Sequence, residues 1–240
     1  MGARKASARI VSDALLLRRV DYGEADLVLT LLTEKLGKVS ALARGARKSA
    51  RRFGGSLEPM HTLSVDLDER PGAELLTLIE AKLKQPRAKI LGSLAAMEAA
   101  GKALSWARRA APPRTPEAAP YAVLTQLLDR LVEAPESEAV AVALAEAGLL
   151  LLSAFGWGID FERCVRCGKQ ARPAQSASID ASRGGLICRD CGGARVRLSA
   201  AARQRLARAA GGEPHALTSE DASVTLAIVE VALGAHAGIE

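Results

Sequence analysis

Four cysteines form the clearest chemical pattern in the sequence, in the two pairs Cys164-Val165-Arg166-Cys167 and Cys188-Arg189-Asp190-Cys191. Each pair has two residues between its cysteines, and 20 residues separate the pairs. A two-residue gap lets both thiolates of a pair turn toward one metal ion, and two such pairs complete a tetrahedral site of four sulfurs. A glycine follows each pair, Gly168 and Gly192, and permits a tight turn around the ion. The spacing therefore predicts one structural Zn²⁺ ion in a zinc ribbon.

Two other uses of paired cysteines fit this sequence less well. Disulfides need an oxidising compartment, and no secretory signal is visible, because Arg18 and Arg19 interrupt the apolar run that begins at Ala14. Redox-active Cys-x-x-Cys pairs usually occur singly near a βαβ pattern, which the sequence lacks. Four protein ligands would leave the ion no open position, so the site favours structure and recognition over hydrolysis. Because so short a ribbon buries little core, we expect metal binding to drive its folding.

Positive charge is concentrated in two zones of the 240-residue chain, which has a net charge of +6 and a pI of about 9.4. Residues 35–57 contain seven Lys or Arg and no acidic residue, and residues 160–208 contain eleven basic and four acidic residues. Residues 90–159, between them, contain five basic and seven acidic residues. Two basic zones around a slightly acidic middle indicate a polyanionic partner.

The first 83 residues have the pattern of five short strands separated by turns. The chain is rich in Val, Leu, Ile and Thr there, and polar and apolar residues alternate. Five strands in so short a segment predict a small closed barrel of the OB type, because closure removes exposed edges. The predicted strands are Arg9–Val20, Leu27–Thr33, Lys38–Ala43, Leu63–Leu67 and Glu74–Leu83.

A basic loop, residues 44–55, connects the third and fourth predicted strands. It contains five cations, three glycines and no acid, so we expect a mobile cationic arm that binds phosphates in a salt-dependent manner. The alternative is a solvated basic loop without a ligand. The barrel region has only Tyr22 and Phe53 as aromatic residues. Base stacking should therefore be weak, and contacts with the sugar-phosphate backbone should dominate.

The rest of the chain predicts a helical domain, residues 84–158 and 194–240, with the zinc ribbon inserted at residues 159–193. The segment Ser137–Gly156 is apolar almost all round, which indicates a buried central helix. The longest uncharged stretch, Ala147–Ile159, is too short to span a bilayer, so we expect a cytoplasmic protein without a membrane partner. The predicted fold class is α+β with several domains. The predicted helices are residues 90–110, 121–133, 137–156, 199–210 and 219–235.

No catalytic motif is recognisable in the sequence. The Gly-x-x-x-x-Gly-Lys loop, His-Glu-x-x-His and Gly-x-Ser-x-Gly are all missing. The three histidines, His61, His215 and His236, are isolated from one another. Asp66 and Asp68 alternate along one strand, and outward-facing positions explain them more simply than a metal site. The chain is therefore interpreted as a binding protein and not an enzyme.

An ordered series of short motifs resembles the RecO family of bacterial recombinational DNA repair mediators, over nearly the whole chain. The resemblance implies an N-terminal OB-fold and an α-helical domain that carries a four-cysteine zinc element, as in the zinc-bearing members of the family. The motifs are Tyr22–Asp26, Leu31–Lys38, Ala43–Lys48, Leu57–Pro59, Gly156-Trp157, Cys164–Gly168 and Gly184–Cys191.

The resemblance also implies an activity. RecO-like proteins bind single- and double-stranded DNA, anneal complementary strands, and work with RecR to help RecA displace single-strand-binding protein; such a protein is associated with the nucleoid. They capture the acidic C-terminal tail of single-strand-binding protein on the helical domain, for which Arg203, Arg205 and Arg208 are candidate cations here. The positions that match the family for DNA contact are Lys35, Lys38, Arg44, Arg47, Lys48, Arg51 and Arg52.

Two other functions were weighed against this one. A zinc-ribbon protein of transcription or translation would explain the ribbon and the charge, but it would not explain the helices between the two basic zones. A metal-dependent nuclease would need a catalytic constellation that the sequence does not contain. For strand annealing, two cationic zones could neutralise and hold two strands, while weak stacking leaves the bases free to pair.

Overall fold

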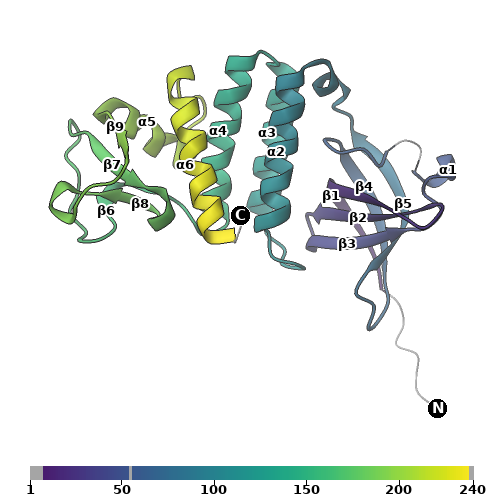
Figure 1. Ribbon diagram of the computed structural model, residues 1–240. Coiled ribbons are helices and arrows are strands. Elements are labelled where there is room, and N and C mark those ends of the chain that lie inside the picture. Colours follow the sequence, from purple (N-terminus) through teal and green to yellow (C-terminus); the bar gives the residue numbers. More distant parts are fainter. Residues whose placement is uncertain (1–7, 54–55, 238–240) are drawn as a thin grey trace.

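The structure is a computed structural model that describes residues 8–53 and 56–237. A β-barrel, a layer of helices and a small β-ribbon follow one another along the molecule, so that the barrel and the ribbon lie at opposite ends (Figure 1). This arrangement confirms the predicted fold class, with its N-terminal barrel, helical region and four-cysteine element.

The barrel closes in the strand order β1-β2-β3-β5-β4. β1 pairs with β2 along one half and with β4 along the other, and a bulge between Leu16 and Arg18 bends it between the two. Short parallel pairing of Ala41 and Leu42 with β5 closes the cylinder. All five predicted strands are present, with bounds that differ by a few residues. The strands are β1 (Ala8–Tyr22), β2 (Asp26–Thr33), β3 (Gly37–Ala43), β4 (Thr62–Glu69) and β5 (Leu76–Gln85).

The basic segment between β3 and β4 is anchored to the barrel, which differs from the mobile arm that the sequence predicted. It forms turns and then the short helix α1 (Ala50–Phe53). Phe53 is 3% exposed and belongs to the core of the barrel, together with Leu57. Burial of this ring holds the neighbouring cations against the surface of the barrel. Gly54 and Gly55, the last two residues of the predicted arm, lie outside the described residues.

The central layer is built around one apolar helix, α4, which packs against four other helices. α4 is long and apolar enough to cross a membrane by length and composition, but 56% of it is buried inside the protein, as expected for a core helix. This confirms the predicted central helix. The elements of the layer are the 3₁₀ turn η1 (Ala88–Gly92), α2 (Leu94–Ala110), α3 (Ala118–Glu133), α4 (Ser137–Ala154), α5 (Ala200–Ala210) and α6 (Ser219–Ala237).

The ribbon is a four-stranded sheet that shares its core with the helices. Phe161, Ile179, Leu186 and Leu198 are buried in the same hydrophobic cluster as α4, α5 and α6. Packing therefore stabilises the ribbon in addition to any metal, which the sequence analysis did not anticipate. The sheet also extends to Leu198, beyond the predicted end at residue 193. Its order is β6-β8-β7-β9, with β6 (Asp160–Cys164), β7 (Ala177–Asp180), β8 (Gly185–Ile187) and β9 (Val196–Leu198), and with the 3₁₀ turns η2 (Ala181–Arg183) and η3 (Arg189–Cys191).

The barrel and the helices meet closely at the start of β3. Gly37 has a φ of +65°, and a Cβ atom at this position would lie 1.9 Å from the carbonyl oxygen of Thr115. Next to it, the backbone oxygen of Lys38 accepts a hydrogen bond from the Arg114 amide at 2.8 Å, and Lys38 Nζ donates to the Arg108 oxygen at 2.8 Å. Only glycine fits this approach between β3 and the α2–α3 loop.

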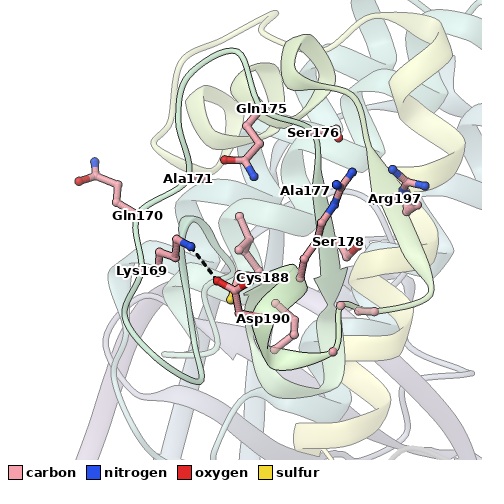
Figure 2. A pocket seen from close by; sticks show the side chains of 16 residues that line it. Lys169, Gln170, Ala171, Gln175, Ser176, Ala177, Ser178, Cys188, Asp190 and Arg197 are labelled. Atoms are coloured by element: carbon pink, nitrogen blue, oxygen red, sulfur yellow. Dashed lines mark hydrogen bonds and ion pairs between the residues drawn. The ribbon is translucent and has the colours of Figure 1, made fainter.

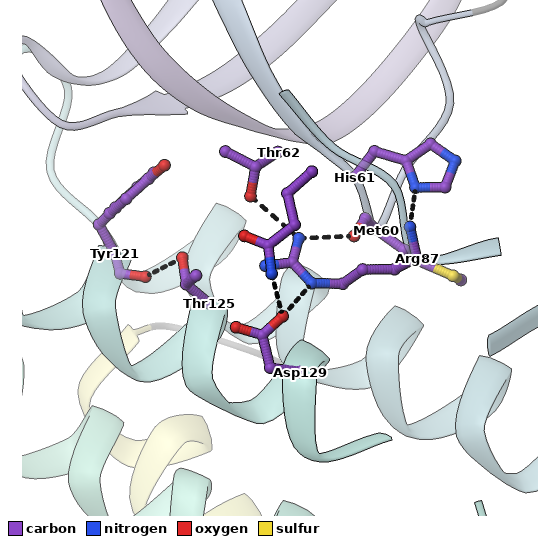
Figure 3. Close-up of polar contacts among 8 residues, drawn as sticks. Met60, His61, Thr62, Arg87, Tyr121, Thr125 and Asp129 are labelled. Atoms are coloured by element: carbon purple, nitrogen blue, oxygen red, sulfur yellow. Dashed lines mark hydrogen bonds and ion pairs between the residues drawn. The ribbon is translucent and has the colours of Figure 1, made fainter. Parts of the chain in front are cut away.

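A buried arginine makes a second junction between the barrel and the helices (Figure 3). The side chain of Arg87 is 1% exposed, and its Nε atom donates to Asp129 Oδ1 on α3 at 2.7 Å. Its Nη1 atom donates to Thr62 Oγ1 at 2.9 Å and to the Met60 oxygen at 3.2 Å, while its backbone amide donates to His61 Nδ1. These contacts fix the end of the barrel on α3.

Candidate metal centre and nucleic-acid interface

The four cysteines converge as the sequence predicted. Their Sγ atoms all lie within 4.8 Å of one another, and those of Cys167 and Cys188 are 3.7 Å apart. A tetrahedral ion with metal–sulfur bonds of about 2.3 Å separates its sulfurs by about 3.8 Å. The thiols are free of disulfides. The cluster therefore has the dimensions of a site for one metal ion.

Two turns of the ribbon bring the sulfurs together. Cys164 ends β6, and its oxygen accepts a hydrogen bond from the Gly168 amide at 2.8 Å. Cys188 follows β8, and its oxygen accepts from the Cys191 amide at 3.1 Å. Gly168 and Gly192 have φ values of +74° and +98°, which side-chain-bearing residues rarely adopt. These glycines permit the turns as predicted.

The electrostatics of the cluster favour a bound cation. Hydrogen bonding, above all from the Cys188 amide, lowers the pKa of the buried Cys164 thiol to about 6. Hydrogen bonds with the thiols of Cys188 and Cys167, and to a smaller extent burial and the negative charge of Cys164, raise the pKa of Cys191 to about 12. One thiolate thus opposes ionisation of the others, and a divalent ion would relieve this by binding all four as thiolates. Four sulfur ligands suit a structural ion and leave no position for water or substrate.

The surface of the ribbon beside the cysteines is polar and hollow. A cavity of about 460 Å³ lies next to Cys188, and Ser178 and Arg197 are among its lining residues (Figure 2). Lys169 Nζ and Asp190 Oδ2 form an ion pair at 2.7 Å that joins the two cysteine pairs, as Figure 2 shows. Several basic residues of the ribbon have no ion-pair partner within the described residues, so this end of the molecule remains positive. They are Arg166, Arg172, Arg189, Arg195 and Arg197.

Five of the seven predicted DNA-contacting cations gather beside the β1–β2 hairpin. The Gly45 amide donates to Asp26 Oδ1 at 2.7 Å, and the Arg47 amide donates to the Ala25 oxygen at 3.0 Å. Arg52 lies over the ring of Phe53, 5.1 Å from its centroid. All five side chains are exposed, and a groove of about 550 Å³ runs between this segment and β1. The five cations, called the basic segment below, are Arg44, Arg47, Lys48, Arg51 and Arg52.

The other two predicted contacts, Lys35 and Lys38, lie at the opposite end of β3. Lys38 and Arg44 are six positions apart along extended strand, a distance of about 20 Å. Lys35 Nζ donates to the Val11 oxygen at 2.6 Å but remains exposed. Lys38 is half-buried, and its pKa is lowered by burial and by the nearby Arg108. Lys38 therefore connects the barrel to the helices and lies apart from the basic segment.

The three arginines of α5 have three different environments. Arg203 is 4% exposed, in contrast to the surface position that partner binding requires, and donates to the oxygens of Phe161 at 2.9 Å and Arg172 at 3.0 Å. Arg205 forms a two-pronged ion pair with the buried Asp221, at 2.6 and 2.9 Å. Arg208 is about half exposed and lies 3.7 Å from Glu213. Arg203 thus ties α5 to the ribbon, and only its two neighbours reach solvent.

Sequence reasoning missed Arg87 and the contribution of β1 to the basic end of the barrel. Gln85-Pro86 indicated a boundary, but no local pattern showed that the next residue becomes buried between two domains. Arg18 and Arg19 were noted only as a break in an apolar run, and Arg19 proves to line the groove beside the basic segment. Within the described residues, the four cysteines are the one cluster of potential metal ligands.

Comparison with known proteins gives consistent similarities along the chain. The family model for the recombination protein O N terminal matches residues 8–87, and that for the recombination protein O C terminal matches residues 91–238. The DNA repair protein RecO of Anaeromyxobacter sp. (strain Fw109-5) is 39% identical over 183 residues, 76% of this chain and 70% of that protein. The RecO of Geobacter sulfurreducens is 35% identical over 199 residues, 83% of this chain and 79% of that protein.

Proposed function

The chain belongs to the RecO family of DNA repair and recombination proteins, and on that premise we propose that it is a recombination mediator that binds single- and double-stranded DNA. In this proposal it anneals complementary strands and works with RecR to help load RecA onto DNA covered by single-strand-binding protein. It acts in the cytoplasm, on the nucleoid, and does so as a binding protein without catalysis.

The basic segment is the observation that carries the proposal. Its five cations are exposed, and Arg44, Lys48 and Arg51 have no ion-pair partner within the described residues. Phe53 and α1 hold the backbone of this segment on the barrel, so phosphate binding has to order the side chains but not the loop. Long cationic side chains contact phosphates without reading base edges. The expected binding is therefore insensitive to sequence.

The separation of the two basic zones changes how annealing could work. The ribbon and the barrel lie at opposite ends of the molecule (Figure 1). Successive helices between them pack with their axes about 8–10 Å apart, which places the zones roughly 20 Å or more from each other. Two DNA strands, one bound to each zone, would be too far apart to form base pairs. We therefore assign annealing to the barrel end, where the basic segment can screen the phosphates of both strands at once.

The ribbon and α5 have the remaining proposed roles. The four cysteines hold one structural Zn²⁺, which fits their sulfur spacing and fixes the two turns of the ribbon. Between the ribbon and α5 is a cavity of about 700 Å³, lined in part by Arg172, Arg205 and Arg208. Its charge suits the acidic C-terminal tail of single-strand-binding protein, and Arg203 supports its wall from within.

A salt titration tests the proposal. Binding to a labelled single strand and to a duplex is followed by fluorescence anisotropy. The metal content of the same sample is measured separately, and we expect one zinc per chain. Changing all five residues of the basic segment to Ala should reduce the slope of log K against log salt by about 3–4 for the single strand. An unchanged slope would contradict the proposal. The control replaces five exposed cations elsewhere by Ala, namely Arg70, Lys82, Lys89, Lys102 and Arg109.

A further inference from the structure

The outer face of the β1–β2 hairpin presents an exposed tyrosine that the proposed phosphate contacts do not use. Of the two Trp, two Tyr and three Phe in the chain, Tyr22 is the only one that is exposed, with 60% of its surface accessible. Phe53, the other aromatic of the barrel, is buried. Tyr22 is therefore the aromatic ring that is most open to stacking by an external planar group.

Strand register shows what surrounds this ring. Directly opposite residues of an antiparallel pair share one face of the sheet. Tyr22 is opposite Asp26, and Val20 is opposite Val28, which is in turn opposite Leu42 on β3. Leu27 and Leu29, which flank Val28 on β2, are buried inside the barrel. Tyr22, Val20, Val28 and Leu42 therefore form an apolar strip on the outer face, called the Tyr22 strip.

Two of these residues are well exposed, and cations flank the strip. Val20 is 42% exposed, while Val28 and Leu42 are half-buried. On one side, Arg18 is opposite Thr30, which is opposite Ser40. On the other side, Arg44 directly follows β3, and strand alternation continues it onto the same outer face. Both arginines are exposed and free of ion pairs within the described residues.

The strip is continuous with the basic segment. The Gly45 amide binds the Asp26 carboxylate at 2.7 Å, and Asp26 is opposite Tyr22. Three acidic residues occur in the hairpin, but Asp26 is engaged by this amide and Asp21 lies 3.7 Å from Arg47. The amide hydrogen bond leaves the negative charge of Asp26 in place, so all three carboxylates count. Against them stand Arg18 and the five cations of the basic segment, six positive charges to three negative ones. The balance of charge around the strip is thus positive, which matches a polyanion that also offers apolar surfaces.

We infer that the Tyr22 strip binds the unpaired bases of a single-stranded polynucleotide, with one base stacked on Tyr22 and the adjoining phosphates on Arg18 and Arg44. This inference rests on the proposed function and specifies how that site distinguishes single strands from duplexes. Aromatic rings stack on any base, so the contact adds affinity without sequence preference. In a duplex the base faces are already covered by their neighbours. The ring therefore favours single strands over duplexes.

The test compares three labelled probes on the full chain by fluorescence anisotropy: an oligothymidine, an abasic oligonucleotide of the same length, and a duplex. The variant Tyr22→Ala should bind the oligothymidine about 5- to 100-fold more weakly than the original protein. Its affinity for the abasic strand and for the duplex should not change. Tyr22→Phe retains the ring and should retain the affinity. Val231→Ala, which alters a similarly exposed residue on α6, is the matched surface control.

The outcomes separate this inference from the proposed function. Equal affinity of Tyr22→Ala and the original protein for oligothymidine would overturn the inference while leaving DNA binding intact. An equal loss on all three probes would also overturn it, since the ring would then act through the fold. If the original protein bound no probe at low salt, the proposed function itself would fail. Thermal unfolding of each variant checks that the barrel remains folded.

Discussion

Arg87 Nε lies 2.7 Å from Asp129 Oδ1, and this contact joins the segment that follows β5 to the C-terminal half of α3. The guanidinium is 1% exposed, and its Nη2 atom has no hydrogen-bond partner within the described residues, whereas the carboxylate is 38% exposed. A buried cation depends strongly on its counter-ion, because an unpaired charge inside a protein is costly. The attachment of the barrel to the helices therefore depends on the carboxylate of Asp129, which is partly exposed to solvent.

Removing that acid should destabilise the whole molecule. Asp129→Ala leaves the buried guanidinium without its counter-ion, and we expect the free energy of unfolding to fall by about 2 kcal/mol or more. Chemical denaturation measures this change. The double variant Arg87→Met with Asp129→Leu removes both charges and should cost less than Asp129→Ala alone. Glu58→Ala, which breaks an exposed pair with Arg19, should cost less than about 1 kcal/mol.

The close approach at Gly37 can be separated from the cost of its backbone conformation. Gly37→Ala and Gly72→Ala both place a side chain at positive φ, +65° and +79°. Only the first adds a Cβ that collides with Thr115, because nothing lies within 4 Å at Gly72. Gly72→Ala should cost about 1 kcal/mol and Gly37→Ala clearly more, measured by thermal unfolding. Equal losses of stability in the two variants would mean that the α2–α3 loop moves away from the new Cβ without a cost in free energy.

Arg203 should control the attachment of the ribbon to α5. Arg203→Met removes the donor for four backbone oxygens, including those of Phe161 and Gln175. We expect faster amide hydrogen exchange in residues 160–164 and 172–177 and a stability loss of about 2 kcal/mol, because charged donors make strong hydrogen bonds. Arg208→Met changes an exposed arginine on the same helix and should have neither effect. Unchanged exchange in Arg203→Met would show that apolar packing alone holds the ribbon.

Asp221 should contribute to stability in a pH-dependent way. Burial alone would raise its pKa, but hydrogen bonds from Arg205 and Thr218 outweigh burial and lower it. Because the folded-state pKa is depressed, the contribution is present above the unfolded-state pKa, near 3.9, and is lost as the pH falls through the folded-state value. Asp221→Asn should therefore destabilise the protein at pH 7 by about 1–3 kcal/mol, and by progressively less below about pH 4. Denaturation curves between pH 2 and 7 test this, and parallel curves for the two proteins would contradict it.

Local patterns were sufficient for the features that depend on neighbours in sequence. The cysteine spacing predicted a cluster that the structure confirms, because the two-residue gap and the following glycines determine each turn. Alternation predicted the barrel strands, and the apolar sequence of α4 predicted its central place. β6 and β9 were not predicted as strands, because charged residues interrupt the apolar residues of each.

Long-range packing determined the features that the sequence did not predict. Phe53 looked like part of a mobile loop, since nothing local showed that the barrel has room for its ring. Lys38 and Arg203 had the composition of surface cations, and they became internal donors only because carbonyl oxygens from distant segments meet them. Counting charges along the sequence identifies the basic zones, but it does not show which of their Lys and Arg side chains remain exposed to bind a ligand.

The barrel has a core of its own, but part of its outer face is completed by the helices. Leu15, Leu17 and Leu32 come from its strands, yet they belong to the hydrophobic cluster of the helices. The two family models meet between residues 87 and 91, at the junction that Arg87 completes. A protein cut there would leave three leucines and a buried cation facing water on the first fragment. The two halves that sequence comparison distinguishes should therefore be inseparable in solution, so that they melt together and neither is soluble without the other.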